Sequence, residues 1–108
     1  MIQKDSYQTQ SSSISLHTIP ADEINKIAKK LKDSSVGFCR KLIMTPSISG
    51  NEKTVADLYL KEMEKLGYDS YFRDEGGNVI GIIRGIEDGP TIMYNSHLDH
   101  VDPGDLSE

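Results

Sequence analysis

The stretch TIMYNSHLDH, residues 91–100, decides the expected fold. Its first four residues form a largely apolar run, as in a central strand of a sheet that helices cover on both faces. The polar residues His97, Asp99 and His100 follow this run almost at once. Side chains just beyond the carboxyl end of a central strand commonly form the active site of an α/β protein. The expected fold is therefore α/β, with a functional site directly after this strand.

A β-hairpin is expected before that strand. Two runs rich in β-branched and aromatic residues, 71–72 and 79–83, lie on either side of residues 74–78, DEGGN, whose residue types favour a tight turn. Residues 87–90, EDGP, make a further turn into the third strand. The third strand has no expected partner on at least one side, and an unpaired hydrophobic strand favours association.

Two helices are expected before the hairpin. Apolar residues recur at helical spacing within residues 21–44, and Thr45-Pro46 ends this helix because the residue before proline avoids the helical region. The serines and glycine at 34–37 are expected to weaken its middle. Cys39 is interpreted as a core residue rather than a nucleophile, because no base lies near it in the sequence.

The second helix is expected within residues 47–69. Ser49 and Glu52 have the S-x-x-E spacing of a capping box, and Gly67 stands where a helix commonly ends in glycine. Apolar residues at positions 55, 58, 59, 63 and 66 mark one face.

The amino-acid composition limits the classes of protein to which this chain can belong. The net charge of −5 argues against nucleic-acid binding, which favours a basic surface. No run approaches the ~20 apolar residues of a membrane span. Residues 1–20 are rich in Ser, Gln and Thr and have no hydrophobic region of a secretory signal, so they are expected to form a disordered leader. The single cysteine forms no internal disulfide, which fits a reducing cytoplasm.

His97 and Asp99 are the candidate functional residues. Residues two apart on an extended segment point to the same side, so both side chains can face one site. A metal-binding histidine commonly donates its second ring N–H to a carboxylate, or Asp99 could bind the metal itself. The alternative is structural, with His97 ending the strand and Asp99 in a local turn. His100 is expected to be an exposed loop residue, and Asp102 and Asp105 to belong to a turn.

Several motifs, in their order and spacing, resemble the N-terminal part of the co-catalytic zinc peptidase and deacylase family. PSISGNE (46–52) resembles the start of that family's second helix, GNVIGIIRG (77–85) its hairpin strand, GPTIMYNSHLDHV (89–101) its third strand and metal loop, and PGD (103–105) the following turn. The family includes aminoacylase, glutamate carboxypeptidase, acetylornithine deacetylase and succinyl-diaminopimelate desuccinylase. Within it, the sequence of these motifs is most similar to that of hydrolases associated with selenium metabolism. The resemblance covers residues 22–108 and departs at Asp102, which separates Val101 from Pro103.

The resemblance implies a hydrolase with two Zn²⁺ ions per site that cleaves amide bonds of small peptides or N-acyl amino acids. Co²⁺ or Mn²⁺ would suit similar ligands. His97 matches the family's first zinc ligand, and Asp99 matches the acidic residue of the catalytic site that orients this ligand. The general base, the bridging aspartate, the other ligands and the dimerisation domain come later in family members. Residues 21–108 are therefore expected to be an incomplete α/β/α catalytic domain, inactive alone, with homo-oligomerisation left open.

Two other functions stay open. The chain could be a non-catalytic binding module that self-associates or binds a partner through an exposed strand at residues 91–94. It could also bind a metal through His97, His100 and the neighbouring aspartates alone. A catalytic zinc site generally needs three protein ligands, and nothing in these residues enforces that geometry. The sequence therefore favours the hydrolase fragment.

Overall fold

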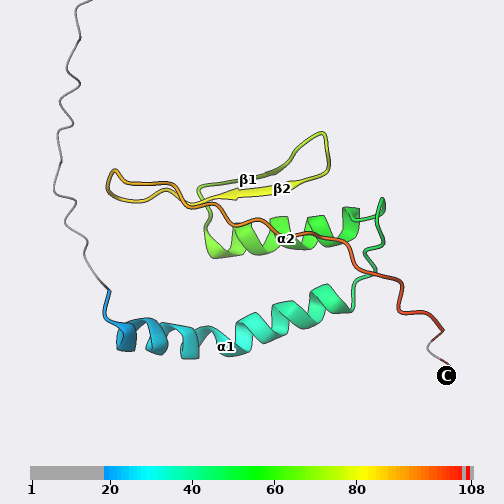
Figure 1. Ribbon diagram of the computed structural model, residues 1–108, viewed down its shortest axis with the longest axis horizontal. Coiled ribbons are helices and arrows are strands. Elements are labelled where there is room, and N and C mark those ends of the chain that lie inside the picture. Colours follow the sequence, from blue (N-terminus) through cyan, green and yellow to red (C-terminus); the bar gives the residue numbers. More distant parts are fainter. Residues whose placement is uncertain (1–18, 106, 108) are drawn as a thin grey trace, which may run out of the picture. The chain divides into compact units, whose positions relative to one another are not determined.

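The computed structural model describes residues 19–105 and residue 107. Its elements are helix α1 (Ala21–Ile43), helix α2 (Lys53–Leu66) and strands β1 (Ser70–Arg73) and β2 (Val79–Ile82), shown in Figure 1. Of the described residues, 19–32 belong to one compact unit and those from Asp33 onward to a second. The predicted leader, residues 1–20, lies outside the described residues as far as residue 18, and His17 lies there with it.

Helix α1 is continuous and ends where the sequence predicts. Acidic residues in its first turn and Arg40 and Lys41 in its last turn complement the helix dipole. The helix runs without interruption through residues 34–37, so the predicted single helix is confirmed, and its weakening at these residues stays a prediction. It ends at Ile43, and the Thr45 hydroxyl donates to the carbonyl oxygen of Lys41 at 2.6 Å. That bond satisfies one of the carbonyl groups that a helix end leaves free.

Helix α2 carries the small core of the second unit. Val55 and Ala56 are buried on it. The helix ends at Gly67, whose φ of 75° lies in the left-handed region that glycine adopts at low cost. The N–H of Gly67 donates to the carbonyl oxygen of Glu64 at 3.0 Å. The predicted glycine end of this helix is confirmed.

Strands β1 and β2 form the predicted antiparallel hairpin, with Phe72 opposite Ile80. The turn is closed by Asp74, whose carboxylate accepts hydrogen bonds from the backbone N–H and side-chain amide of Asn78, at 2.8 and 2.9 Å. Gly77, with a φ of 88°, makes the reversal possible. The DEGGN segment therefore makes its turn through side-chain contacts as well as through glycine.

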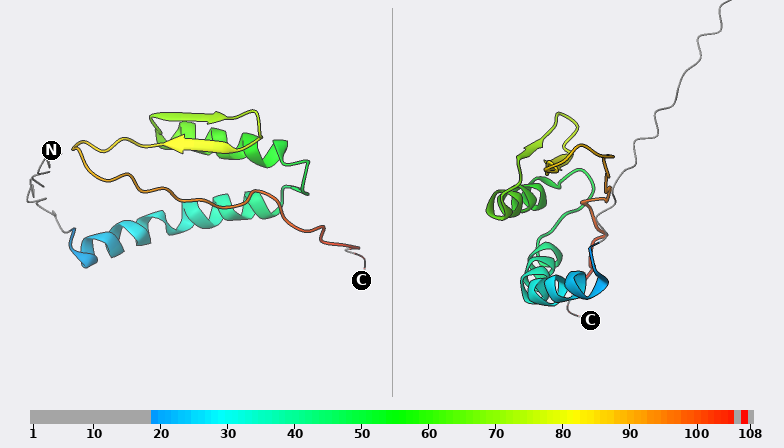
Figure 2. Two further views of the ribbon diagram at one scale, coloured as in Figure 1. Left: turned by 45° about the horizontal axis from the view of Figure 1, so that its top comes forward. Right: turned by 90° about the vertical axis from the view of Figure 1, so that its left-hand side faces the viewer.

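The hairpin lies along α2, as both views in Figure 2 show, and both strands contact that helix. Gly81 is the point of closest approach. A Cβ atom at this position would lie 2.7 Å from Met63 Sδ and 2.8 Å from Tyr68 Cδ1. The absence of a side chain at Gly81 therefore lets β2 approach α2.

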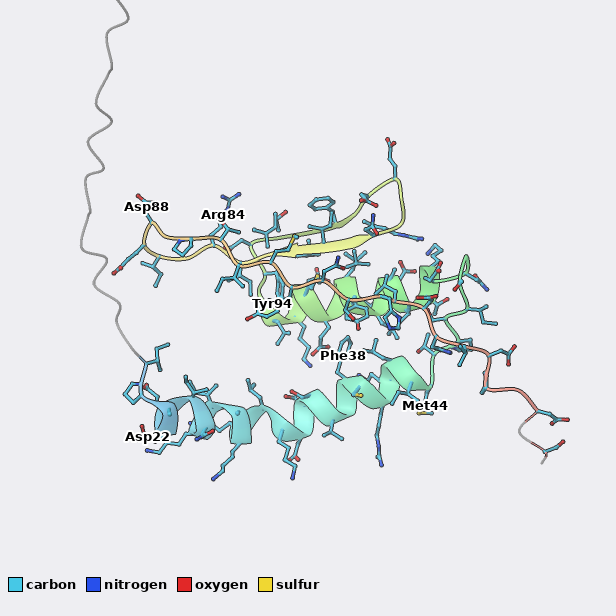
Figure 3. The ribbon with its side chains drawn as sticks, viewed as in Figure 1. Asp22, Phe38, Met44, Arg84, Asp88 and Tyr94 are labelled. Carbon is cyan, nitrogen blue, oxygen red and sulfur yellow. The ribbon has the colours of Figure 1, made fainter. Side chains whose placement is uncertain are left out.

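Phe38 joins the second part of α1 to α2. Its ring meets that of Tyr59 edge to face, with centroids 5.4 Å apart, and Figure 3 shows Phe38 pointing from α1 toward α2. Cys39 lies one position further round the helix and is exposed, so its predicted core position is wrong. A step of one residue turns about 100° around a helix, which moves Cys39 off the packed face.

The third predicted strand is not formed within the described chain. Residues 91–94 pair with neither β1 nor β2. Ile92, Met93 and Tyr94 are 74%, 84% and 92% exposed, although the sequence predicts a strand covered on both faces. A strand needs a partner for its backbone N–H and C=O groups, and the described residues supply none here. The prediction of an α/β/α domain with this segment at its centre stays a prediction.

Neither described helix has the length and apolar character that crossing a bilayer requires.

Candidate functional site

Residues 97–100 lie against the segment that joins α1 to α2. After β2 the chain reverses and runs back toward that segment, as the orange-to-red part of Figure 1 shows. The N–H of His100 donates to the carbonyl oxygen of Ser47 at 2.8 Å, and the Ser47 hydroxyl donates to the carbonyl oxygen of Leu98 at 2.8 Å. Ser47 is fully buried. These bonds fix the register between two segments about fifty residues apart in the sequence.

The structure brings His97 and Asp99 together. Nδ1 of His97 lies 2.7 Å from the backbone carbonyl oxygen of Asp99 and 3.3 Å from its carboxylate oxygen Oδ1. The His97 side chain is 81% exposed, and Nε2 has no hydrogen-bond partner among the described residues. A ring with one nitrogen engaged and the other free has the arrangement of a metal-binding histidine. The role of the pair stays a prediction, but its geometry suits that role.

Ser49 holds the other side of the Asp99 carboxylate, a contact that no local pattern in the sequence indicates. Its hydroxyl donates to Asp99 Oδ2. The predicted capping box is wrong, because Glu52 is the N-cap of α2 and makes no side-chain capping bond. The carboxylate of Glu52 instead accepts from the backbone N–H of Gly50 at 2.7 Å. The S-x-x-E spacing is local, whereas the partner of Ser49 lies 50 residues away.

Asp99 is held in its ionised form. Chiefly the Ser49 hydroxyl, and to a smaller degree the backbone of Asp99 and the His97 ring, lower the pKa of the Asp99 carboxyl below its usual value of 3.8. Hydrogen bonds to a carboxylate stabilise its charged form. Asp99, beside His97, is thus an anion at neutral pH, suited to accept a hydrogen bond from Nδ1–H and to stabilise a nearby positive charge.

His100 is not the exposed loop histidine that the sequence predicts. The residue is half-buried, and its two ring nitrogens lie 2.9 Å from the carbonyl oxygen of Val101 and 3.1 Å from that of Thr45. These two acceptors, in that order, raise the pKa of His100 above 6.5. A neutral imidazole has one N–H and can satisfy only one of them, whereas the protonated ring satisfies both. His100 therefore helps to hold the segment that carries His97 in place, through its contact with Thr45.

The residues that follow form the predicted turn. Asp102 accepts a hydrogen bond from the backbone N–H of Gly104 at 2.9 Å, and Gly104 has a φ of 77°. Asp105 accepts from the backbone N–H of Ser107 at 2.9 Å. These short loops bind each carboxylate to its own segment. Turn formation at Asp102 and Asp105 is confirmed.

An open cavity of about 270 Å³ lies beside His97 and Asp99. It is lined by the hairpin turn, the start of α2 and the returning segment: Glu52, Arg73, Gly76, Gly77, Asn78, Val79, Asn95, Ser96, His97, Leu98 and Asp99. Most of these residues are polar, and both signs of charge are present. A small polar molecule could therefore contact His97 and the hairpin turn at once.

The chemistry of the site fits one metal ligand but not a complete metal centre. Within residues 19–105 and 107, no group of three or more His, Cys, Asp or Glu side chains is placed to hold a metal ion. A catalytic zinc ion generally takes three protein ligands and a water. His97, oriented by Asp99, can supply one of them. The remaining ligands would have to come from elsewhere.

The sequence is similar to several curated proteins. It is 35% identical over 89 residues to YgeY of Escherichia coli K12, an alignment that covers 82% of this chain and 21% of YgeY. It is 35% identical to a protein of Pyrococcus furiosus and 38% identical to one of Thermococcus kodakarensis, each over 72 residues. Both archaeal proteins are provisionally named LysW-lysine/LysW-ornithine hydrolases, and the alignments cover 67% of this chain and 21% and 20% of those proteins.

The chain therefore spans about a fifth of the length of the curated relatives that it matches. No family model matches the sequence, and no solved structure matches it.

Proposed function

We propose that this chain is the N-terminal portion of a metal-dependent hydrolase that cleaves amide bonds of small peptides or N-acyl amino acids, with His97 as one of its metal ligands. The observation that carries the proposal is the arrangement of His97, whose Nδ1 faces Asp99 while Nε2 is left free. Two relatives are named as hydrolases, which supports the reaction class. Their names favour a substrate with a lysine or ornithine residue.

Each residue of the site has a defined task in this proposal. His97 would hold the metal through Nε2, and Asp99 would accept a hydrogen bond from Nδ1–H, which fixes the ring and makes Nε2 more basic. The bound metal, most simply zinc, supplies a Lewis acid and a water of lowered pKa. The polar cavity beside His97 admits the substrate. The general base and the remaining ligands belong to the rest of the domain.

The exposed apolar residues support a larger domain. Ile92, Met93 and Tyr94 lie largely in solvent and directly precede the site. In a complete α/β/α domain this segment is a central strand, paired on both sides and covered by helices. Burial of one such side chain contributes about 1.5–3 kcal/mol, so pairing of this segment would stabilise the domain substantially.

The native protein provides the test. An antibody against residues 52–67, which lie mainly in α2, would isolate it from its source for measurement of intact mass, bound metal and amide hydrolysis. We expect a mass several times that of this chain, bound metal, and loss of both metal and hydrolysis in a strain that carries His97→Ala. His17→Ala is the matched histidine control, since it lies far from the site in sequence. Hydrolysis that is unaffected by His97→Ala would contradict the proposal.

A second candidate is a non-catalytic binding module. The exposure of Ile92, Met93 and Tyr94 is the observation that favours it, because an exposed apolar segment suits contact with a partner or a second copy. Light scattering of the purified chain with Ile92→Lys and Tyr94→Lys tests it. In a binding module these changes abolish a defined complex, whereas the hydrolase fragment gives nonspecific aggregation that they only reduce.

A further inference from the structure

The segment before α2 contacts the candidate site with every second residue. Thr45 meets His100 through its carbonyl oxygen, Ser47 bonds to the backbone of residues 98 and 100, and Ser49 bonds to Asp99. The contacts of Thr45 and Ser47 involve only the His100 ring and backbone atoms of residues 98 and 100. Ser49 is different, because it bonds to a functional side chain.

The contacts of Asp99 run from Ser49 to His97. Oδ2 of Asp99 accepts the Ser49 hydroxyl, while Oδ1 lies 3.3 Å from His97 Nδ1. The backbone carbonyl of Asp99 also faces Nδ1, at 2.7 Å. Both acceptors of the Nδ1 proton therefore belong to one residue. Ser49 is the side chain from the other segment that holds this residue in place.

The backbone on both sides of Asp99 is held by Ser47. Without the Ser49 hydroxyl, however, the Asp99 carboxylate has only its contact with His97 to keep it in position. Its side chain is 38% exposed, so water can replace a lost partner and a rotated carboxylate is not penalised by burial. The Ser49 hydroxyl thus sets the direction of the carboxylate that faces His97.

We propose that Ser49 is a positioning residue, which holds Asp99 so that the neutral His97 ring carries its proton on Nδ1 and presents Nε2 as the ligand atom. The inference rests on the proposed function only in taking Nε2 for a ligand. The series of contacts from Ser49 through the Asp99 carboxylate to His97 Nδ1 itself stands on the described distances.

The test is a nitrogen-15 NMR measurement of the His97 ring in the 108-residue chain, at a pH where the ring is neutral. Nδ1 and Nε2 have distinct chemical shifts in the two tautomers, so the ratio of the tautomers can be read directly. We expect the Nδ1–H form to dominate in the native chain. Ser49→Ala should lower the ratio of Nδ1–H to Nε2–H about fivefold, the effect of losing one net hydrogen bond.

Two further variants separate positioning from folding. Ser49→Thr keeps the hydroxyl and should restore the native ratio. Ser96→Ala removes a hydroxyl beside His97 that reaches only the His97 backbone, at 3.5 Å, and should leave the ratio unchanged. The amide spectrum of each variant shows whether the fold is retained. An unchanged ratio in folded Ser49→Ala, or no rescue by Ser49→Thr, overturns the inference.

A negative result in this experiment does not contradict the proposed function, and a negative test of the proposed function does not contradict the role of Ser49. The tautomer ratio requires neither metal nor substrate, so it reports on Ser49 even if the native protein hydrolyses nothing. Conversely, a Ser49→Ala chain with the native ratio would leave the assignment of His97 as a ligand intact. Loss of hydrolysis in His97→Ala, measured on the native protein, addresses only that assignment.

Discussion

The buried hydroxyl of Ser47 donates a hydrogen bond to the backbone carbonyl of Leu98, 51 residues further along the chain, at 2.8 Å. The Ser47 carbonyl oxygen in turn accepts the N–H of His100. One residue thus holds the backbone on both sides of Asp99. The candidate site depends on this pairing, because His97 has no comparable anchor of its own.

Ser47→Ala should therefore loosen the site and destabilise the second unit. The change leaves the carbonyl oxygen of Leu98 without its buried partner, at a cost of about 1–3 kcal/mol in the free energy of unfolding. Urea unfolding measures that free energy, and hydrogen exchange of the His100 amide measures the local loosening. Ser35→Ala, at an exposed position of α1, is the control and should change stability by less than ~0.5 kcal/mol. Equal free energies of unfolding for the Ser47→Ala and Ser35→Ala variants would show that Ser47 does not anchor the segment of residues 98–100.

Gly81→Ala should separate the hairpin from α2. The added methyl group would lie 2.7 Å from Met63 Sδ and 2.8 Å from Tyr68 Cδ1, and the Tyr68 ring cannot yield as easily as a methionine end. Overpacking of this kind costs about 1–3 kcal/mol. Gly89→Ala is the matched control, since a Cβ there meets nothing within 4 Å. A Gly81→Ala chain as stable as Gly89→Ala in urea would show that the packing has room to adjust.

His100 should make stability depend on pH. The carbonyl oxygens of Val101 and Thr45, and the nearby charges of Asp99 and Asp102, raise the pKa of His100 above 6.5 in the folded chain. A raised folded-state pKa means that protonation stabilises the fold. This contribution is complete below pH 6.5 and is lost as the pH rises through the folded-state pKa.

Unfolding measured from pH 5.5 to pH 9 in the native chain and in His100→Gln tests this dependence. The native chain should lose stability over the alkaline part of that range, and His100→Gln should lose much less. The lowered pKa of Asp99 acts in a separate window, because its contribution is lost only as the pH falls toward and below 3.8. Identical pH profiles for the two chains would contradict the role of His100.

Asp99→Asn should weaken metal binding in the native protein without abolishing it. A side-chain amide accepts a hydrogen bond from Nδ1–H less strongly than a carboxylate does. Loss of such an orienting group commonly lowers metal affinity about 10–100-fold. Titration of the metal-free protein with zinc would measure the change. Asp102→Asn is the control, because Asp102 bonds to the backbone of its own turn. Equal zinc affinities of the two variants would show that Asp99 does not orient the metal ligand.

The local elements were predictable from the sequence. The spacing of apolar residues and the glycine at position 67 indicate α2, and the DEGGN turn indicates the hairpin that the structure contains. These signals work because their causes lie within a few residues, in helical periodicity and in the backbone freedom of glycine. The end of α1 before Thr45-Pro46 has an equally local cause.

The long-range contacts of the site were not predictable in the same way. The hydroxyl of Ser49 fits a local cap as well as a carboxylate 50 residues away, and spacing alone cannot distinguish them. The half-buried position of His100 depends on the Thr45 carbonyl, 55 residues away in the sequence. Residues 91–94 have the composition of a strand, but a strand forms only where a partner is present.

The most direct test of the account is the zinc content of the native protein with His97 intact and with His97→Ala, measured by mass spectrometry after gel filtration. If His97 is a ligand in a completed site, the native protein retains stoichiometric zinc, and the His97→Ala protein loses most of it together with amide hydrolysis. If both proteins retain the same zinc, or if neither binds any metal and neither hydrolyses an amide, His97 is not a metal ligand of a hydrolase.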